Sequence, residues 1–397
     1  MYRLTPALQR YAWGSPTAIP ALLGTEPTGD PVAEAWFGAH PSAPSLVRAE
    51  QGEVRLDELV GADPDRALGD DVRARFGATL PYLLKVIAAD SPLSLQVHPG
   101  KERAIGGYVR EDAVGIPLDA PQRSFRDRNH KPELVYALTR FEAMCGFRAP
   151  RRLNELLAGL DAQIAVQLRG ILSAQPSVAG IETAFTWLLR PDSRPDPAAI
   201  DELAAACGAR LADGSPSPRA DRTVVRLQQA YPGDPGVVTS LLLNPVTLQA
   251  GEALFVPAGG VHAYLGGTGV ELMASSDNVL RAGLTPKHVD VEELLRNVDY
   301  VAAPPIRVAP ERFHGATKMF YAPVDDFELS VTRVAGGSSH PLPGRGPRIL
   351  LCLEGTVVAT AARGEVDLRR GQAAFVPADD GELTVRGSGT LVQADVP

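Results

Sequence analysis

Residues 251–262 read GEALFVPAGGVH. Gly251 and the segment 257–260 consist of turn formers, and the four apolar residues between them predict a short buried strand. His262 begins the next strand and can point into the mouth of a β-barrel. A rigid frame of glycine and proline suits a metal-ligating histidine, which must be held in a fixed orientation. A single histidine is also compatible with a buried core residue that binds nothing, so the interpretation depends on partners elsewhere in the chain.

Two upstream segments supply such partners. Residues 93–99 (LSLQVHP) alternate like a strand, and the period of two places Gln96 and His98 on the same face. Residues 129–138 (NHKPELVYAL) form a polar cluster that leads into an apolar strand and contain Glu133. Together the segments provide two imidazoles, a carboxylate and an amide oxygen, from His98, His262, Glu133 and Gln96. This set suits a divalent cation such as zinc and leaves positions for water or substrate.

The length of 397 residues exceeds the size at which one hydrophobic core usually stops growing, about 250–300 residues, so we expect two or three domains or lobes. The 35 prolines and 38 glycines favour a turn-rich β architecture over a helical bundle. The net charge of −8 argues against an electrostatic nucleic-acid binder, which would carry a basic face. An anionic substrate must therefore be held by lysines and arginines that cluster locally.

The cysteines Cys145, Cys207 and Cys352 are few, far apart and odd in number. They predict neither a disulfide framework nor a thiolate metal site, and a reducing cytoplasm is the expected compartment. The N-terminal stretch carries charges and lacks the apolar core of a signal peptide, and no run approaches 18 apolar residues. We therefore expect a soluble cytoplasmic protein without a membrane partner, and a monomer, since no segment demands a protein partner.

The composition changes between residues 150 and 232, where alanine, leucine and charged residues recur at helical spacing. Residues 200–207 (IDELAAAC) form the clearest helix. The segment predicts an all-α insertion of four or five helices that serves as a scaffold or lid and carries no catalytic constellation. The expected domains are residues 1–149 and 233–300 as two parts of a catalytic barrel, 150–232 as the helical insertion, and 301–397 as a second barrel.

The C-terminal region contains a weak internal repeat. Residues 371–377 (GQAAFVP) repeat the spacing of residues 251–257 (GEALFVP). The position that matches His262 is occupied by Glu382, and no histidine follows it. The predicted fold is therefore mainly β, with two β-barrels of the jelly-roll type, of which the C-terminal one is metal-free, and with the helical insertion as an all-α domain.

Seven stretches along nearly the whole chain resemble type I phosphomannose isomerases, a family of the cupin superfamily of β-barrels. They are YAWGS (11–15), EAWFGAHP (34–41), PYLLKV (81–86), SLQVHP (94–99), NHKPEL (129–134), PAGGVHAY (257–264) and ASSDNVLRAGLTPK (274–287). The combination is specific, although any single stretch is not. Ala35 and Phe37 depart from the residues usual in the second stretch, and they put no ligand in doubt. The spacing of residues 251–262 also resembles the second conserved motif of cupins.

The resemblance implies an activity and a set of site residues. Members of the family interconvert mannose 6-phosphate and fructose 6-phosphate in the cytosol, and the resemblance implies one zinc ion per chain. Carried over residue by residue, the zinc ligands fall on Gln96, His98, Glu133 and His262. The active-site arginine falls on Arg281, the pocket lysines on Lys131 and Lys287, and the tryptophan near the pocket on Trp13.

Interconversion of an aldose and a ketose moves a proton between C1 and C2, and we expect a cis-enediol between them. The metal would polarise the two oxygens as a Lewis acid. Arg281 is expected to stabilise the developing oxyanion or to bind the phosphate. The predicted proton-transfer groups are Lys131 and Glu271, and His130 is a candidate for assisting ring opening. The alternative role of Glu271 is a buried ion pair with Arg281, and that of Lys131 is to orient Glu133.

The sugar phosphate needs further contacts. Lys287 and Lys85 are the predicted phosphate contacts, although Lys85 lies in an apolar strand and is equally compatible with an edge lysine whose amine reaches solvent. Trp13 is expected to form a platform or wall of the pocket. Tyr264 and Asp277, which lie close to the metal-binding segment in the sequence, complete the predicted substrate site.

Two other functions are compatible with the sequence. Two histidines and one carboxylate are also the facial triad of non-haem iron, so a metal-dependent oxygenase on the same barrel is one alternative. The fourth ligand Gln96 and the cluster of lysines and arginine favour the isomerase over the oxygenase. The second alternative is a non-catalytic sugar-binding protein, which would bind the sugar without isomerising it.

Overall fold

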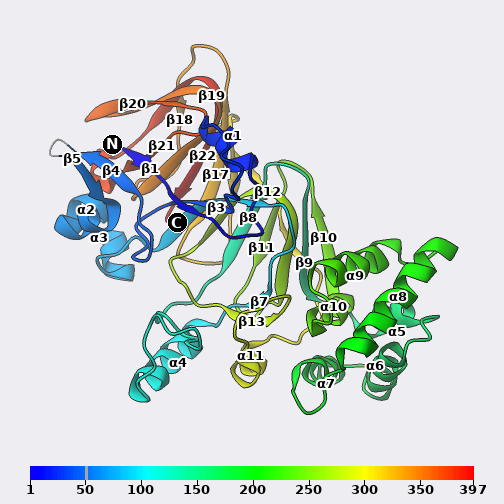
Figure 1. Cartoon of the computed structure of the whole chain (residues 1–397). Coiled ribbons are helices and arrows are strands. Elements are labelled where there is room, and N and C mark those ends of the chain that lie inside the picture. Colours follow the sequence, from blue (N-terminus) through cyan, green and yellow to red (C-terminus); the bar gives the residue numbers. More distant parts are fainter. Residues whose placement is uncertain (50–51) are drawn as a thin grey trace.

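Antiparallel β-strands form the body of the molecule, as Figure 1 shows. The computed structural model describes residues 1–49 and 52–397. Their strands form two sheets of eleven strands each, with helices at the margins of both. The prediction of a mainly β fold is confirmed.

The first sheet, called the site sheet below, carries the predicted ligands. Its strands are β2 (Ala7–Gln9), β3 (Glu34–Phe37), β6 (Tyr82–Ala89), β7 (Leu95–Val97), β8 (Glu133–Ala137), β9 (Phe141–Phe147), β10 (Leu243–Leu248), β11 (Ala253–Val256), β12 (His262–Ala274), β13 (Leu280–Gly283) and β14 (Ile306–Val308). The long strand β12 pairs with β7 and β9 near its start and with β6 and β8 along the rest. It therefore joins two parts of the sheet.

The motif at residues 251–262 folds as predicted. Gly251 (φ +92°) and Gly259 (φ +81°) adopt left-handed conformations that glycine takes up without a steric penalty. Between these turns, β11 is buried at every position, and His262 begins β12. A third left-handed glycine, Gly267 (φ +112°), marks the point where β12 changes neighbours. A Cβ atom at Gly267 would approach the carbonyl oxygen of Arg140 to 2.5 Å, so a larger residue would disturb this crossing.

The second sheet packs against the site sheet. Its strands are β1 (Tyr2–Thr5), β4 (Leu46–Ala49), β5 (Gly52–Arg55), β15 (Glu311–Phe313), β16 (Thr317–Phe320), β17 (Glu328–Val334), β18 (His340–Pro341), β19 (Arg348–Ala361), β20 (Gly364–Arg369), β21 (Ala373–Val376) and β22 (Thr384–Asp395). The repeated stretch forms β21 after a left-handed Gly371, which confirms the predicted repeat of the strand. Glu382, which matches His262 in the repeat, is exposed and pairs with Arg345.

Strand pairing crosses the predicted domain limits. Strands β1, β4 and β5 come from the segment that we assigned to the catalytic barrel, but they pair in the second sheet, where Tyr2 lies opposite Phe375. Strand β14, expected in the C-terminal barrel, pairs with β11 of the site sheet. The assignment of residues 1–149 and 301–397 to separate barrels is therefore wrong for these four strands. Short strands carry no local signal of which distant strand they will join.

The strands of the site sheet present two different faces. On β6, Tyr82 and Leu84 join a hydrophobic cluster that includes Phe375 and Leu329 of the second sheet. Lys85, between Leu84 and Val86 of the same cluster, points to the other side, into a polar cavity. The same alternation on β8 and β12 turns apolar residues toward the second sheet and polar residues toward the cavity.

Helices flank both sheets. Outside the predicted insertion lie α1 (Ala18–Leu23), α2 (Leu56–Ala62), α3 (Pro64–Phe76), α4 (Lys101–Ala113), α11 (Val291–Asn297) and a 3₁₀ turn (Ala378–Asp380). The insertion contains α5 (Pro150–Leu157), α6 (Gln163–Ala174), α7 (Val178–Leu189), α8 (Pro197–Asp213) and α9 (Pro218–Ala230), followed by α10 (Pro235–Thr239) and a 3₁₀ turn (Ser240–Leu242). Five helices within residues 150–232 agree with the prediction of four or five. None of the described helices is long and apolar enough to cross a membrane.

The helical insertion shares its hydrophobic core with the site sheet. Phe185 of α7 packs edge-on against Phe147 of β9, with ring centroids 5.3 Å apart. Both side chains belong to one buried cluster that also contains Leu95 and Val97 of β7. Packing therefore does not separate an all-α domain from the site sheet, and the insertion supports the strand that precedes His98.

Replacing Phe185 by alanine removes a fully buried ring from this shared cluster. We expect the free energy of unfolding to fall by about 3–5 kcal/mol. Circular dichroism and tryptophan fluorescence should both report a single transition, in which helices and sheets unfold together. Val178→Ala is the matched control, because Val178 is exposed on the same helix, and it should change stability by less than about 0.5 kcal/mol. Two separate transitions would show that the insertion has a core of its own.

Candidate metal centre

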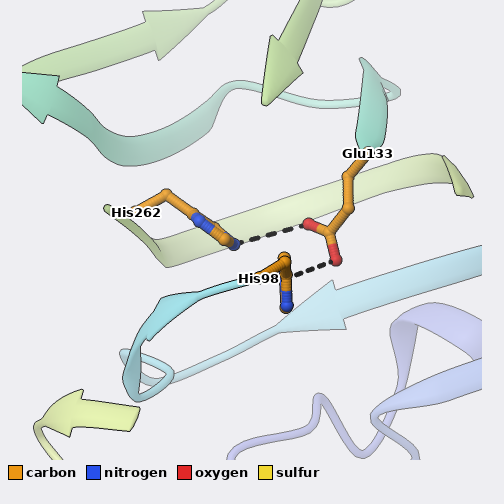
Figure 2. A group of neighbouring side chains, drawn as sticks. All are labelled: His98, Glu133 and His262. Atoms are coloured by element: carbon orange, nitrogen blue, oxygen red, sulfur yellow. Dashed lines mark ion pairs between the residues drawn. The ribbon is translucent and has the colours of Figure 1, made fainter. Parts of the chain in front are cut away.

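Three predicted ligands, His98, Glu133 and His262, lie together in the site sheet, as Figure 2 shows. Their candidate ligand atoms all lie within 4.8 Å of one another, and all three side chains are buried. Nε2 of His98 is 3.0 Å from Oε1 of Glu133, and Nε2 of His262 is 3.4 Å from Oε2. Among the described residues, no other group of three or more His, Cys, Asp and Glu side chains is arranged to hold a metal ion.

Strand pairing brings these residues together from distant parts of the sequence. His98 directly follows β7, Glu133 begins β8 and His262 begins β12. β7 and β8 both pair with β12, and Gln96 of β7 lies opposite His262. The backbone N–H of Gly259 donates to the carbonyl oxygen of His98 at 2.8 Å. The turn before His262 therefore also fixes the backbone of the other histidine.

Backbone carbonyls determine which nitrogen of each histidine faces Glu133. Nδ1 of His98 is 2.8 Å from the carbonyl oxygen of Asn278, and Nδ1 of His262 is 3.0 Å from that of Gly260. A carbonyl oxygen accepts hydrogen bonds and does not donate them, so both Nδ1 atoms carry the proton. Nε2 is therefore the nitrogen of each histidine that is left to ligate a metal ion, and it faces the carboxylate in both residues.

The electrostatics of the group fit a divalent cation. Nε2 of His98 is buried without a hydrogen-bond partner. Burial, assisted by the charge of Lys131, lowers the pKa of His98 to about 4, so its imidazole is neutral at pH 7. Burial alone would raise the pKa of Glu133, but Lys131 and His98 hold it well below its usual range. A neutral imidazole with an unpartnered nitrogen beside an ionised carboxylate suits a cation between them, so the residues fit an ion such as zinc.

Gln96, the fourth predicted ligand, lies next to the group. It lines the same cavity as Glu133 and His262. Its amide nitrogen donates to Ser94 Oγ at 3.0 Å, so its amide oxygen is the atom available as a ligand. Gln96 thus lies beside the other predicted ligands, and its role as a ligand stays a prediction.

The cavity beside the ligands is lined mainly by polar and charged side chains. They are Glu34, Lys85, Ser94, Gln96, Lys131, Glu133, His262, Tyr264 and Glu271, together with the apolar residues Ile87, Leu93 and Ala263. The predicted residues Lys85, Lys131, Tyr264 and Glu271 therefore share one site with the metal ligands.

Lys85 is buried inside this cavity, which excludes the alternative of an edge lysine that reaches solvent. Its Nζ lies 3.2 Å from Glu271 and 3.8 Å from Glu34, and 4.8 Å from the ring centroid of Trp36. Burial lowers the pKa of Lys85, but the two carboxylates outweigh it and raise the pKa above its usual value. Lys85 is thus an ammonium group held between two acids, and this environment does not favour a phosphate.

Glu271 pairs with Lys85, and the alternative ion pair with Arg281 is wrong. The register of β12 and β6 places Glu271 directly opposite Lys85, whereas Arg281 lies on β13. Burial and the neighbouring charge of Glu133 raise the pKa of Glu271. Its role in proton transfer stays a prediction.

Lys131 and Tyr264 both contact Glu133. Nζ of Lys131 is 3.2 Å from Oε1, and the hydroxyl of Tyr264 donates to Oε2 at 3.0 Å. Burial and the charge of Glu133 raise the pKa of Tyr264 well above its usual range, so the phenol stays neutral. Lys131 therefore contacts Glu133 as expected for the alternative role, in which it orients this carboxylate. The Lys131 side chain also lines the cavity.

His130 does not line the cavity. Its Nε2 lies 2.9 Å from Asp326 Oδ2, in the segment that leads into β17 of the second sheet. In an extended segment, successive side chains point to opposite sides, so Lys131 and Glu133 point inward while His130 points outward. The prediction that His130 assists ring opening is therefore wrong, because the residue forms a contact between the two sheets.

A second group of cations lies close to the metal ligands. Arg281 of β13 lies opposite Gln96 of β7, directly beside the metal ligands in the sheet. Burial and the nearby charge of Arg126 lower the pKa of Arg281, and burial, Arg281 and Arg126 lower the pKa of Lys287. Such mutual repulsion is relieved when an anion binds, so Arg281 and Lys287 suit the phosphate of a substrate.

Trp13 and Asp277 lie near this second group. Nζ of Lys287 is 5.7 Å from the ring centroid of Tyr11, and that ring is 5.7 Å from the ring of Trp13. Trp13 itself packs against the apolar cluster behind the cavity and is not among the lining residues. Oδ1 of Asp277 is 3.6 Å from Nε2 of His40. Tyr11 therefore lies between Lys287 and Trp13, and the role of Trp13 as a wall of the pocket stays a prediction.

Three residues that the sequence did not single out belong to the site. Glu34 lines the cavity and accepts a hydrogen bond from Nε1 of Trp36 at 2.6 Å. The period of two on that strand, which places Glu34 and Trp36 on one face, was the available signal. Tyr11 is part of the stretch YAWGS, and Arg126 lies between two quoted motifs, where no local pattern marks it.

Models of two protein families match the chain. The model described as "Phosphomannose isomerase type I, catalytic domain" matches residues 1–150. The model described as "Mannose-6-phosphate isomerase, cupin domain" matches residues 316–396. Together they cover the segments that contain three of the four predicted metal ligands and the repeated strand of the second sheet.

Curated relatives and solved structures extend the match to the full length. The mannose-6-phosphate isomerase of Escherichia coli (strain K12) is 39% identical over 399 residues, which is 99% of each chain. The human mannose-6-phosphate isomerase is 31% identical over 96% of this chain and 94% of its own. A crystal structure of the Salmonella typhimurium enzyme bound to fructose 6-phosphate and zinc has a TM-score of 0.89 at 37% identity, covering 100% of this chain and 99% of that one. This chain belongs to the mannose-6-phosphate isomerase family.

Proposed function

We propose that this chain is a zinc-dependent isomerase that interconverts mannose 6-phosphate and fructose 6-phosphate. The observation that carries the proposal is the buried group of His98, Glu133 and His262, whose ligand atoms lie close enough together to hold a cation. The group lies in a chain that matches mannose-6-phosphate isomerases along its full length. The Salmonella typhimurium relative was solved with both zinc and fructose 6-phosphate bound.

His98, Glu133 and His262 would hold the zinc ion, with the amide oxygen of Gln96 as a fourth ligand. When bound, the ion would supply Lewis-acid polarisation of the substrate oxygens. Lys131 and Tyr264 hold the carboxylate of Glu133 from two sides, so its orientation does not depend on the ion alone. The backbone carbonyls behind both histidines keep the ligand nitrogens turned inward.

The proton transfer would proceed through a cis-enediol. A base removes the proton from C2 of the open-chain aldose while O1 gains a proton; C1 then receives a proton while O2 loses one, which gives the ketose. Glu271 and Lys131 are the candidates for moving these protons, since both line the cavity and are buried. Lys85 is held protonated by Glu34 and Glu271 and would donate a hydrogen bond to a sugar oxygen.

The phosphate would bind to Arg281 and Lys287, with Tyr11 and Asp277 beside them. Arg126 is a third cation close to these two residues. In the absence of an anion, the positive charges of the three side chains repel one another. Lys85, our other predicted phosphate contact, is enclosed by carboxylates instead. The assignment therefore divides the site into a metal-binding end for C1 and C2 and a cationic end for the phosphate.

The two alternative functions are less well supported. An oxygenase would need open positions around iron, whereas here Gln96 is available as a fourth ligand, and the nearby cations Arg281 and Lys287 suit a sugar phosphate. A binding protein without turnover would not need the buried Glu271 and Lys85 pair opposite the metal group. Oxygen uptake with ferrous ion, or sugar binding without isomerisation, would support either alternative.

We also infer a cytoplasmic monomer, with two cupin-like barrels and the helical insertion at residues 150–232. Three buried cysteines without disulfide bonds fit a reducing compartment. The match of one family model to the cupin domain at residues 316–396 supports a second barrel. The limits of the predicted domains are kept except for the four strands that pair across them.

Removal and return of the metal tests the function. A coupled assay should detect isomerisation of mannose 6-phosphate in the purified protein, and a chelator should reduce the rate by at least about 100-fold. Added zinc should restore it. Magnesium added in the same way is the control, because hard cations prefer sites rich in oxygen ligands. Zinc-loaded protein without turnover would refute the proposed function.

Lys131→Ala tests the proton-transfer role. We expect kcat to fall by about 100-fold to 10,000-fold, with zinc affinity changed far less, because the ammonium group touches the substrate cavity but does not ligate the metal. Lys318→Ala, at an exposed position of the second sheet, is the control and should leave both values unchanged. A normal kcat in Lys131→Ala would remove this residue from the mechanism and leave Glu271 as the candidate.

Lys287→Ala tests the phosphate contact. The loss of one charge-assisted contact should raise KM for mannose 6-phosphate by about 10-fold, with kcat little affected, because the residue lies in the cationic group and is neither a predicted metal ligand nor part of the cavity lining. The ratio of mutant to parent KM should be smaller at high salt, because salt screens the attraction between Lys287 and the phosphate in the parent protein. A fall in kcat with unchanged KM would contradict the assignment.

A further inference from the structure

Two segments that border the metal ligands are joined through one buried side chain. Asn278 lies just before β13 and is fully buried. Its amide nitrogen donates to the carbonyl oxygens of Asp127 at 2.9 Å and Asn129 at 2.8 Å. Its amide oxygen accepts from the backbone N–H groups of Arg126 at 2.7 Å and Asp127 at 3.2 Å. Both donor hydrogens and both acceptor positions of the amide are therefore used by loop 126–129.

The backbone of the same residue contacts a metal ligand. The carbonyl oxygen of Asn278 accepts the hydrogen bond from Nδ1 of His98 at 2.8 Å. That bond keeps the proton on Nδ1 and leaves Nε2 free as a ligand atom. A displacement of Asn278 would therefore change the position of the carbonyl that fixes the tautomer of His98.

The loop that Asn278 holds leads directly to the rest of the site. Loop 126–129 is followed by Lys131 and by Glu133, the carboxylate of the metal group. In the other direction, Asn278 is followed by Arg281, which lies opposite Gln96 in the sheet. One buried amide thus lies between the segments that carry a histidine ligand, the carboxylate ligand and the cation proposed for the phosphate.

Neighbouring side chains reinforce this junction. The hydroxyl of Ser276 donates to Asp127 Oδ1 at 2.9 Å, and the backbone N–H of Asp277 donates to Asp127 Oδ2 at 2.7 Å. The backbone N–H of Asn278 donates to Ser276 Oγ at 3.2 Å. Side chains, rather than a β-ladder, therefore hold the two segments in register, and the geometry of the junction depends on a few residues.

We propose that Asn278 is a positioning residue of the metal centre. Its carbonyl orients His98, and its side-chain amide fixes the loop that places Lys131 and Glu133. The inference rests on the proposed function only in that a zinc ion binds to His98, Glu133 and His262. A purely structural role would lower the stability of the fold and leave the affinity for zinc unchanged.

Asn297 provides a matched comparison. It is also a buried asparagine, and its amide nitrogen donates to the carbonyl oxygen of Glu293 at 2.8 Å within α11. No hydrogen bond joins its side chain to a metal ligand or to loop 126–129 among the described residues. Asn297→Ala therefore removes a buried amide of the same kind without touching the junction.

The experiment measures the zinc dissociation constant of the full-length protein by competition with a chromophoric chelator, at fixed pH. Asn278→Ala should bind zinc about 10-fold to 100-fold more weakly than the parent, and Asn297→Ala should bind it within about 2-fold of the parent. Amide hydrogen exchange should quicken at residues 126–131 in Asn278→Ala alone. If Asn278→Ala does not fold, Ser276→Ala, which removes the hydroxyl that holds Asp127, should weaken zinc binding in the same direction.

Each result separates the two proposals. Equal zinc affinity in the parent, Asn278→Ala and Ser276→Ala would overturn the positioning role while leaving the isomerase proposal intact. Equal losses in Asn278→Ala and Asn297→Ala would show that a general loss of stability weakens the site, which also overturns it. A parent protein that does not bind zinc would refute the metal centre itself.

Discussion

The buried carboxylate of Glu133 is the constraint on which the site depends. A carboxylate in the interior of a β-sheet is costly unless other groups compensate its charge and fill its hydrogen-bonding positions. Lys131 forms an ion pair with one oxygen of Glu133, and the hydroxyl of Tyr264 donates a hydrogen bond to the other. Nε2 of each histidine also faces the carboxylate. These contacts come from strands β8 and β12 and from the end of β7, so the pairing of the site sheet and the ionisation of one side chain stabilise each other.

The charges around Glu133 explain why a metal ion suits this cavity. Three carboxylates, Glu34, Glu133 and Glu271, face two ammonium groups, Lys85 and Lys131, which leaves one negative charge when all are ionised. A divalent cation would reverse that sign and make the cavity attractive to an anionic sugar phosphate. The cations Arg281 and Lys287 lie outside the cavity lining, so they would bind the phosphate without competing for the carboxylates of the interior.

Much of the site was predictable because its residues follow local rules. The turn formers around residues 253–256 mark a buried strand in any sequence, and the alternation around Gln96 and His98 gives the direction of each side chain. What local rules do not supply is the neighbour of each strand. For this reason Glu271 was matched with Arg281, whereas the register of β12 and β6 joins it to Lys85.

The same limit explains the misplaced strands and His130. Strand β1 carries the residues of an ordinary short strand, and only tertiary pairing with β21 places it in the second sheet. His130 is adjacent to Lys131 in the sequence, and we therefore assigned it to the site. Because side chains alternate in the extended segment, the His130 side chain points toward Asp326 instead. Local patterns, together with the resemblance to a family, supplied the ligand set, whereas the places of Tyr11 and Arg126 required the three-dimensional arrangement.

The two faces of the site strands also give the second sheet a role in the chemistry. Tyr82 of β6 donates its hydroxyl to the carbonyl oxygens of Pro347 and Ala394, at 2.9 Å and 3.0 Å, while Lys85 on the opposite face lies between carboxylates. On β8, Tyr136 packs edge-on against Phe320 of the second sheet, while Glu133 faces the histidines. Each strand that carries a charged group into the cavity is thus anchored from behind by the other sheet. Since buried charges must be held in place, the packing of the second sheet against the backs of these strands helps to fix the side chains that line the cavity.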